Sequence, residues 1–285
     1  MANIRFVSSR NVSFDLLDFD SAKLEKANFH KIKWIPDVTT KQYGTIVNRF
    51  KKEPQIFDCS FKFKGSKAQR KAQIDAFMFQ TEYDVAHLSL SRIYWNNQYI
   101  DCYFNVADTH PVGNGSVYTE IVGQFYCPYP FWIEDLFVEI RPSEASTSGL
   151  PENVKNYNPR YGYEYAYPYA PTALSVEVDS ALDCNFQAVC YGPVSEVSFS
   201  VNGYIYKVNR SLRGGQVLVI DSRDTTPIEK RCYILNENGT TENVFDDRDT
   251  SNSIFKKFPS GPIVINYSRT FGIDFYVFQE RSAPI

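Results

Sequence analysis

Two short alternating runs joined by Asn202-Gly203 constrain the fold of this chain more than any other feature of its sequence. Residues 197–201 read V-S-F-S-V and residues 204–208 read Y-I-Y-K-V, so apolar and polar side chains alternate through most of this segment. Alternation with a period of two is typical of a β-strand with one buried face. Asn-Gly between two such runs favours a type I′ turn, because both central residues of that turn need a positive φ. The segment is therefore predicted to be a β-hairpin.

The remainder of the second half shows the same pattern. Leu174, Val176 and Val178 alternate with polar residues, and Asn238-Gly239 supplies another turn. Further strands are predicted at 216–221, 231–235, 264–267 and 273–278. No helix of useful length is predicted after Thr172, and this indicates a β-sandwich.

The first half combines strands with one helix. Residues 57–64 read F-D-C-S-F-K-F-K, which predicts a strand with one wet face. Gly65 is expected to end this strand and Ser66 to cap the helix that follows. The helix is predicted over 67–80, where alanines recur at 68, 72 and 76 and where Ile74, Phe77 and Met78 form an apolar stripe. Such a stripe is typical of a helix packed on a sheet.

Strands are predicted to resume after this helix. Their expected positions are near 86–94, 98–105 and 117–126, with Gly113-Asn114-Gly115 as turn material.

The length of 285 residues favours two domains, and the composition changes in the middle of the chain. Prolines at 128, 130 and 142 precede a small, polar stretch, and 156–171 reads N-Y-N-P-R-Y-G-Y-E-Y-A-Y-P-Y-A-P. The tyrosines there alternate, but the prolines allow only an edge strand. We expect an N-terminal domain over 1–142, a Pro/Tyr-rich junction over 143–171 and a C-terminal sandwich over 172–285. Residues 271–285 could instead return to the N-terminal domain.

Composition excludes several classes of protein. The 20 Tyr and 22 Phe fit strands and large interfaces. A net charge of −3 gives no electrostatic case for nucleic-acid binding, and we interpret the basic cluster at 62–71 as a solvated face rather than a binding patch. The first 15 residues lack the apolar core of a signal peptide, and no run is long enough to span a membrane. The six cysteines, which form no CxxC pair, are expected to be reduced and to act as small apolar residues.

A search for catalytic, cofactor or metal motifs predicts none. His30, His87 and His110 lack metal-ligand spacing, and no GxSxG, Walker or GxGxxG motif is present. The acidic run 246–249 lacks the glycine and closing glutamate of a calcium loop. Glu134 and Asp135 are neighbours in a predicted strand and would point to opposite faces. The sequence leaves open a catalytic pair of carboxylates contributed by distant segments.

Exposed aromatic residues on a β-sandwich could stack on sugar rings or contact a protein partner. Tyr161, Tyr163, Tyr165 and Trp132 are the candidates for glycan or partner contacts, although packing explains the same residues.

The order of features in the second half resembles the distal tail proteins of long, non-contractile-tailed bacteriophages. The segments that carry the resemblance are V-L-V-I-D-S at 217–222, N-G-T-T-E-N at 238–243, F-P-S-G-P-I-V-I-N-Y at 258–267 and the closing F-Y-V-F-Q-E-R at 275–281. In the first half, the strand–Gly65–helix step and F-Y-C-P-Y-P-F-W at 125–132 are similar to the end of that family's N-terminal domain.

The resemblance implies a mainly β protein with an N-terminal split β-barrel or sandwich, one helix and a C-terminal galectin-like, carbohydrate-module-like β-sandwich. It also implies a hexameric ring at the phage tail tip, made in the host cytoplasm and built into the virion. The ring would join the tail-tube protein to the tail-tip hub, often carry receptor-binding proteins, and leave a central channel for DNA. The alternatives are a carbohydrate-binding sandwich that takes part in host-surface recognition, and a hydrolase.

Overall fold

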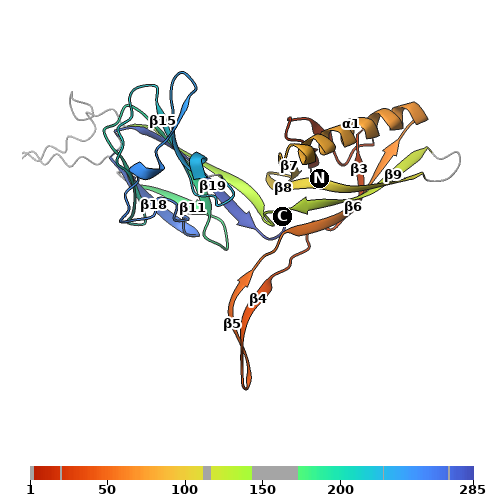
Figure 1. Ribbon diagram of the computed structural model, residues 1–285, viewed down its shortest axis with the longest axis horizontal. Helices are drawn as coiled ribbons and strands as arrows, with labels where there is room; N and C mark the ends of the chain where they lie inside the picture. Colours follow the sequence, from red (N-terminus) through yellow and green to blue (C-terminus); the bar gives the residue numbers. More distant parts are fainter. Residues whose placement is uncertain (1–2, 20, 112–116, 143–172, 227, 269) are drawn as a thin grey trace, which may run out of the picture. The chain divides into compact units, whose positions relative to one another are not determined.

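The computed structural model describes residues 3–19, 21–111, 117–142, 173–226, 228–268 and 270–285 (Figure 1). The chain divides into two compact units, of which the first comprises Met1–Glu134 and Glu280–Ile285 and the second comprises Asp135–Gln279. Strands β10 (Trp132–Ile140) and β19 (Gly272–Arg281) contribute residues to both units. The predicted junction at 143–171, with its edge strand, and the turn Gly113-Asn114-Gly115 lie outside the described residues.

Unit 1 is built on two sheets that share one long strand, β8 (Gln98–Pro111). The first half of β8 pairs with β7, and its second half pairs with β9 from Tyr103 onward, with a register shift between Phe104 and Val106. One sheet therefore continues through β7 to β1 and β2, and the other continues through β9 to β6 and β3. The bounds are β1 Ile4–Val7, β2 Ser13–Asp15, β3 Lys23–Ala27, β6 Gln55–Lys64, β7 Ser91–Trp95 and β9 Tyr118–Cys127.

An aromatic cluster fills the core of this unit. Phe77, which comes from the helix, has no exposed surface. The centroid of its ring lies 5.3 Å from that of Phe61 on β6, 5.3 Å from that of Phe104 on β8 and 5.5 Å from that of Phe6 on β1. Tilted and edge-on rings at these separations add to the free energy gained by burying their area. The alternation predicted for 57–64 is confirmed, because the phenylalanines of β6 face this cluster.

Helix α1 (Lys67–Ala86) begins where the sequence predicted and ends six residues later than 80. Ser66 and Gln69 form a reciprocal capping box, and Gly65 has a φ of +125°. The predicted stripe of Ile74, Phe77 and Met78 packs on the core, whereas the alanines at 68, 72 and 76 are exposed. The buried residues of the helix are Phe77, Thr81 and Asp84. Because Thr81 and Asp84 are polar, the apolar pattern of the sequence did not indicate that the helix continues beyond residue 80.

The strand predicted at 86–94 is correspondingly displaced. Residues up to Ala86 complete the helix, and the chain then turns through Leu88, which has a φ of +51°. Strand β7 begins only at Ser91.

Strands β4 (Ile35–Lys41) and β5 (Gly44–Lys51) of unit 1 pair with each other in a two-stranded sheet. Figure 1 shows this hairpin extending away from the body of its own unit. We call residues 35–51 the arm.

Unit 2 is a β-sandwich. One sheet has the strand order β17-β16-β15-β12-β19-β10 and the other has the order β11-β18-β13-β14. The bounds are β11 Ala173–Val178, β12 Asn185–Tyr191, β13 Val197–Val201, β14 Tyr204–Val208, β15 Val217–Asp221, β16 Cys232–Leu235, β17 Thr241–Asn243 and β18 Gly261–Tyr267, with short 3-10 turns at Ile228–Lys230 and Phe245–Asp247. The predicted hairpin is confirmed, with φ of +48° at Asn202 and +81° at Gly203. The mainly β class with a C-terminal sandwich is likewise confirmed, and the described residues contain a single α-helix.

Edge-on aromatic rings join the two sheets of the sandwich. The ring centroids of Phe186 on β12 and Tyr206 on β14 are 5.5 Å apart, and those of Phe199 on β13 and Phe275 on β19 are 5.1 Å apart. The six cysteines are free and buried, as predicted, and three of them (Cys184, Cys190 and Cys232) belong to this core. No helix within the described ranges is long and apolar enough to cross a membrane.

Candidate functional site: the arm of unit 1

Unit 1 leaves several apolar side chains of the arm half exposed or more. The exposed fractions are 45% for Val38, 53% for Ile46, 48% for Val47, 58% for Phe50 and 90% for Tyr43. Val38 and Val47 are directly opposite each other in the register, so they form one apolar pair on one face of the hairpin. Contiguous exposed apolar residues are typical of interaction surfaces in soluble proteins.

The backbone of the arm is also only half paired. Among the described strands, β4 and β5 pair with no strand but each other, so each leaves one free edge. A two-stranded hairpin is marginally stable alone, and a free edge is a template for pairing with another strand. Gly44 turns the hairpin with a φ of +101°, and Asp37 and Arg49 form an ion pair at 3.0 Å across it. Such exposed pairs contribute at most about 1 kcal/mol.

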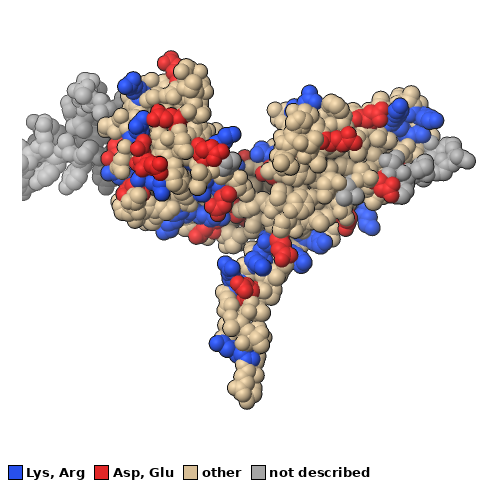
Figure 2. All heavy atoms as spheres, viewed as in Figure 1, with Lys and Arg blue, Asp and Glu red and all other residues tan. Residues whose placement is uncertain are grey.

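The charged groups on the arm are few. Asp37, Lys41, Arg49 and Lys51 are the charged residues among 35–51. Figure 2 shows the arm as mostly uncharged along its length. The arm therefore offers apolar and backbone contacts rather than a charged patch.

The root of the arm, which we define as Trp34 and Lys52 on either side of residues 35–51, packs against the rest of unit 1 through Lys52. The Nζ of Lys52 donates to the carbonyl oxygen of Pro130 at 3.0 Å and lies 4.3 Å from the ring centroid of Phe131 and 5.0 Å from that of Trp34. Burial lowers the pKa of Lys52 to about 8, while the nearby carboxylate of Glu280 acts in the opposite direction. The root is thus a packed cation–π cluster, whereas the arm beyond it is free.

The sequence did not single out the arm, although it holds a signal for one. The segments I-P-D-V-T-T-K and G-T-I-V-N-R-F-K flank the turn Gln42-Tyr43 and are rich in β-branched residues, and the second segment opens with Gly44. That pattern predicts a hairpin but says nothing about whether other residues cover it.

The residues predicted to contact a glycan or a partner are not brought together among the described residues. Trp132 is 1% exposed and packs edge-on against Phe29, with ring centroids 5.8 Å apart, so it offers no face to a ligand on this unit. Tyr161, Tyr163 and Tyr165 lie outside the described residues.

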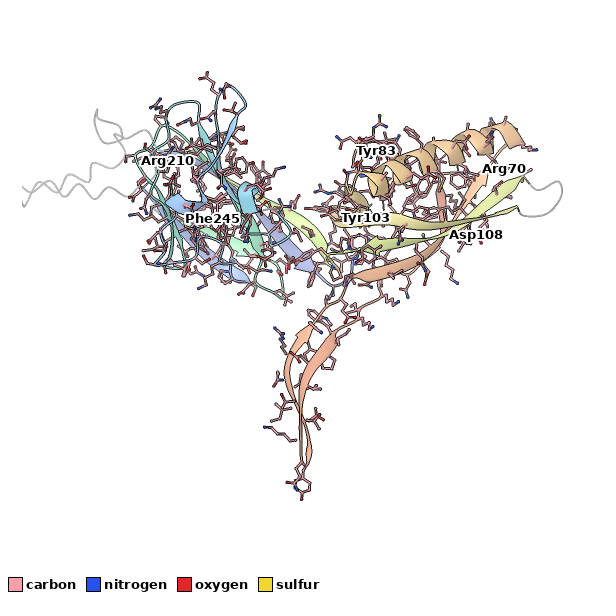
Figure 3. All side chains as sticks on the ribbon, viewed as in Figure 1. Arg70, Tyr83, Tyr103, Asp108, Arg210 and Phe245 are labelled. Atoms are coloured by element: carbon pink, nitrogen blue, oxygen red, sulfur yellow. The ribbon has the colours of Figure 1, made fainter. Side chains whose placement is uncertain are left out.

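The two histidines whose side chains the structure describes, His30 and His87, take part in aromatic ring contacts. His87 stacks on Tyr83, which Figure 3 labels on α1, with ring centroids 3.9 Å apart. His30 lies edge-on to Trp95, and the side chain of His110 lies outside the described residues. In the part of the chain that the structure describes, no three His, Cys, Asp or Glu side chains are grouped as metal ligands.

The acidic residues singled out in the sequence take part in ordinary structural contacts. Asp249 accepts a hydrogen bond from the backbone N–H of Ser251 at 2.9 Å and another from its hydroxyl, and these bonds lower the pKa of Asp249. Glu134 accepts a hydrogen bond from Gln98 at 3.1 Å.

Solved phage proteins share this fold. The crystal structure of the Dit (gp 19.1) protein of phage SPP1 matches with a TM-score of 0.62 at 9% identity, covering 98% of this chain and 99% of that one. Chains of the activated baseplate of phage p2, solved with strontium and with calcium, match with TM-scores of 0.63 at 9% and 10% identity, covering all of both chains. No protein-family model and no curated protein matches the sequence.

Proposed function

We propose that this chain is a structural, non-enzymatic subunit of the tail tip of a long-tailed, non-contractile phage. It would form a hexameric ring in the virion that joins the tail tube to the tail-tip hub and host-adsorption proteins, with a central channel for DNA. Unit 1 would make the ring, and the sandwich of unit 2 would point outward.

The arm is the observation that carries the proposal. Its apolar side chains stand about half exposed and no other described strand pairs with either of its outer edges, so a second copy of the chain would cover what unit 1 leaves open. Fully burying such a side chain is worth about 1.5–3 kcal/mol, so covering the exposed half of several adds up to a stable contact. A closed ring of identical contacts repeats this gain at every interface.

The fold and the chemistry agree with the proposal. The SPP1 protein is described as a paradigm of the hub adsorption apparatus in phages that infect Gram-positive bacteria, and the p2 chains are parts of a baseplate. On the face seen in Figure 2, Lys and Arg are interspersed with Asp and Glu, as expected for a surface that does not grip phosphates.

Mass photometry and negative-stain electron microscopy of the purified chain test the proposal. We expect hexamers and ring-shaped particles, with loss of both in a Val47→Asp variant. Val264→Asp is the matched control, because Val264 is also a strand valine with 38% exposure but lies in unit 2. A sharp monomer of the unaltered chain at micromolar concentration, with no rings in the micrographs, would overturn the proposal. Equal loss of rings in both variants would show that the arm has no specific part in forming the ring.

A further inference from the structure

Unit 2 contains a polar groove between two loops of its sandwich. One wall is the loop from β14 to β15, and the other is the hairpin of β16 and β17. The groove has a volume of about 540 Å³, and a second hollow of about 480 Å³ shares two of its lining residues, Arg213 and Gln216. These volumes are within the range of small-molecule sites.

Hydrogen bonds within and between the two walls hold the groove in shape. The side-chain oxygen of Gln216 accepts from the backbone N–H of Arg213 at 2.7 Å, and its amide nitrogen donates to the side-chain oxygen of Asn236 at 2.8 Å. Asn236 is itself tied to Thr240 by a side-chain bond of 3.1 Å. The polar groups are therefore fixed before any ligand arrives, which lowers the entropy cost of binding.

Arg210 lies on the same groove between two carboxylates. Its guanidinium donates to Glu242 at 2.5 Å and lies 3.6 Å from Asp247. The side chain keeps 41% of its surface exposed, so donors and acceptors face solvent side by side (Arg210 is labelled in Figure 3). Adjacent donors and acceptors of this kind match neighbouring hydroxyl groups on a ligand.

The charges and the lining decide between classes of ligand. Arg210 and Arg213 face Glu242 in the groove and Glu237 in the adjoining hollow, so cations and anions balance and no excess charge remains for a phosphate or sulfate. Ile234 is the one apolar residue among the described residues of the groove lining, and it is 1% exposed, so an apolar ligand would gain little. A neutral ligand with many hydroxyl groups remains.

We propose that this groove of unit 2 binds a neutral saccharide, with Arg210, Gln216 and Glu242 as its hydrogen-bonding residues. Since the described lining offers no aromatic platform, each site binds weakly. Six sites on one ring would act together by avidity. Only this gain from avidity rests on the proposed ring. Saccharide binding by a single groove does not depend on the ring, so the two proposals can be tested separately.

Ligand-observed saturation-transfer NMR tests the groove on the full-length chain. The probes are glucose, galactose, N-acetylglucosamine and their β-linked disaccharides, with glycerol 3-phosphate as the anionic comparator. We expect saturation transfer from at least one neutral sugar, with binding at least about tenfold weaker in Arg210→Ala and Gln216→Ala. Lys207→Ala is the matched control, because Lys207 forms a similarly exposed ion pair with Glu196 but does not line the groove.

Two further measurements distinguish loss of binding from loss of folding or of assembly. Arg210→Lys retains the charge and loses the planar fork, so its binding should also weaken while its thermal unfolding stays unchanged. Mass photometry of the same samples shows whether the assembly is intact and separates a failed groove from a failed ring. Transfer from no neutral sugar, equal binding by wild type and groove variants, or preferential binding of glycerol 3-phosphate would each overturn the proposal.

Discussion

Asp84, near the end of helix α1, accepts hydrogen bonds from Ser9 across 75 residues of sequence. The hydroxyl of Ser9 donates to the carboxylate at 2.5 Å, and its backbone N–H lies 3.3 Å from both carboxylate oxygens. Asp84 has no exposed surface, so this contact fastens the N-terminal segment to the helix inside unit 1.

Asp84→Ala is expected to destabilise unit 1 by about 2–3 kcal/mol, because it leaves the N–H and hydroxyl of Ser9 without their acceptor. Asp84→Asn keeps one acceptor oxygen and should cost less. Urea unfolding followed by circular dichroism measures the free energy, with Asp75→Ala on the exposed face of the same helix as the control. A loss no larger than that of the control would mean that the contact contributes nothing.

Among the described residues, the tip of the arm should be the first site of chymotrypsin cleavage in the dissociated chain. Tyr43 is 90% exposed beside the turn glycine, and no tertiary contact needs to open before the protease can bind. Limited digestion and mass spectrometry should give cleavage after Tyr43, and Tyr43→Ser should abolish it. If the arm is covered by another copy, assembled particles should be cut at least about tenfold more slowly. Equal rates in both states would contradict that cover.

Lys52 should make unit 1 more stable as the pH rises from about 8 to 10.5. The pKa of Lys52 is lowered to about 8 in the folded chain from 10.5. Between these values the unfolded chain binds a proton that the folded chain does not, so unfolding becomes less favourable with rising pH. Below pH 8 both states are charged and the penalty for burying the charge is present in full.

Burial raises the pKa of some tyrosines and cysteines, such as Tyr191 and Cys232, each to about 12. These groups begin to ionise in the unfolded chain in the same pH range, so they make the folded chain less stable as the pH rises. The measurement is therefore the difference in unfolding free energy between wild type and Lys52→Met at pH 7 and pH 10. We expect this difference to move in favour of wild type at pH 10. A difference that is flat with pH would show that Lys52 is not desolvated at the root of the arm.

Gly203→Ala should cost unit 2 about 1–2 kcal/mol, because the residue has a φ of +81° that an alanine adopts with strain. An added Cβ would contact nothing within 4 Å, so the loss comes from the backbone alone. Gly214→Ala is the matched control, since that glycine also has open space around it and has no positive φ. Similar unfolding temperatures for the two variants would contradict the type I′ turn.

Local patterns in the sequence were sufficient wherever the fold depends on nearest neighbours. The alternation in β6, the helix N-cap at Ser66 and the hairpin at Asn202-Gly203 were all predictable, because strand period, cap and turn are properties of a few consecutive residues. The end of α1 was not, since the buried Thr81 and Asp84 interrupt the apolar stripe, and Ser9, which donates to the Asp84 carboxylate, is 75 residues away in the sequence.

The candidate site separates the two kinds of information most clearly. The sequence by itself determined that this chain is built from short strands with one helix and that it is rich in tyrosine and phenylalanine, which fit strands and large interfaces. It could not distinguish Trp132, which is buried in a core, from Phe50, which is 58% exposed on the arm. Only the tertiary structure decided that, because burial depends on which distant segments cover a strand, and the strand's own pattern is the same whether or not they do.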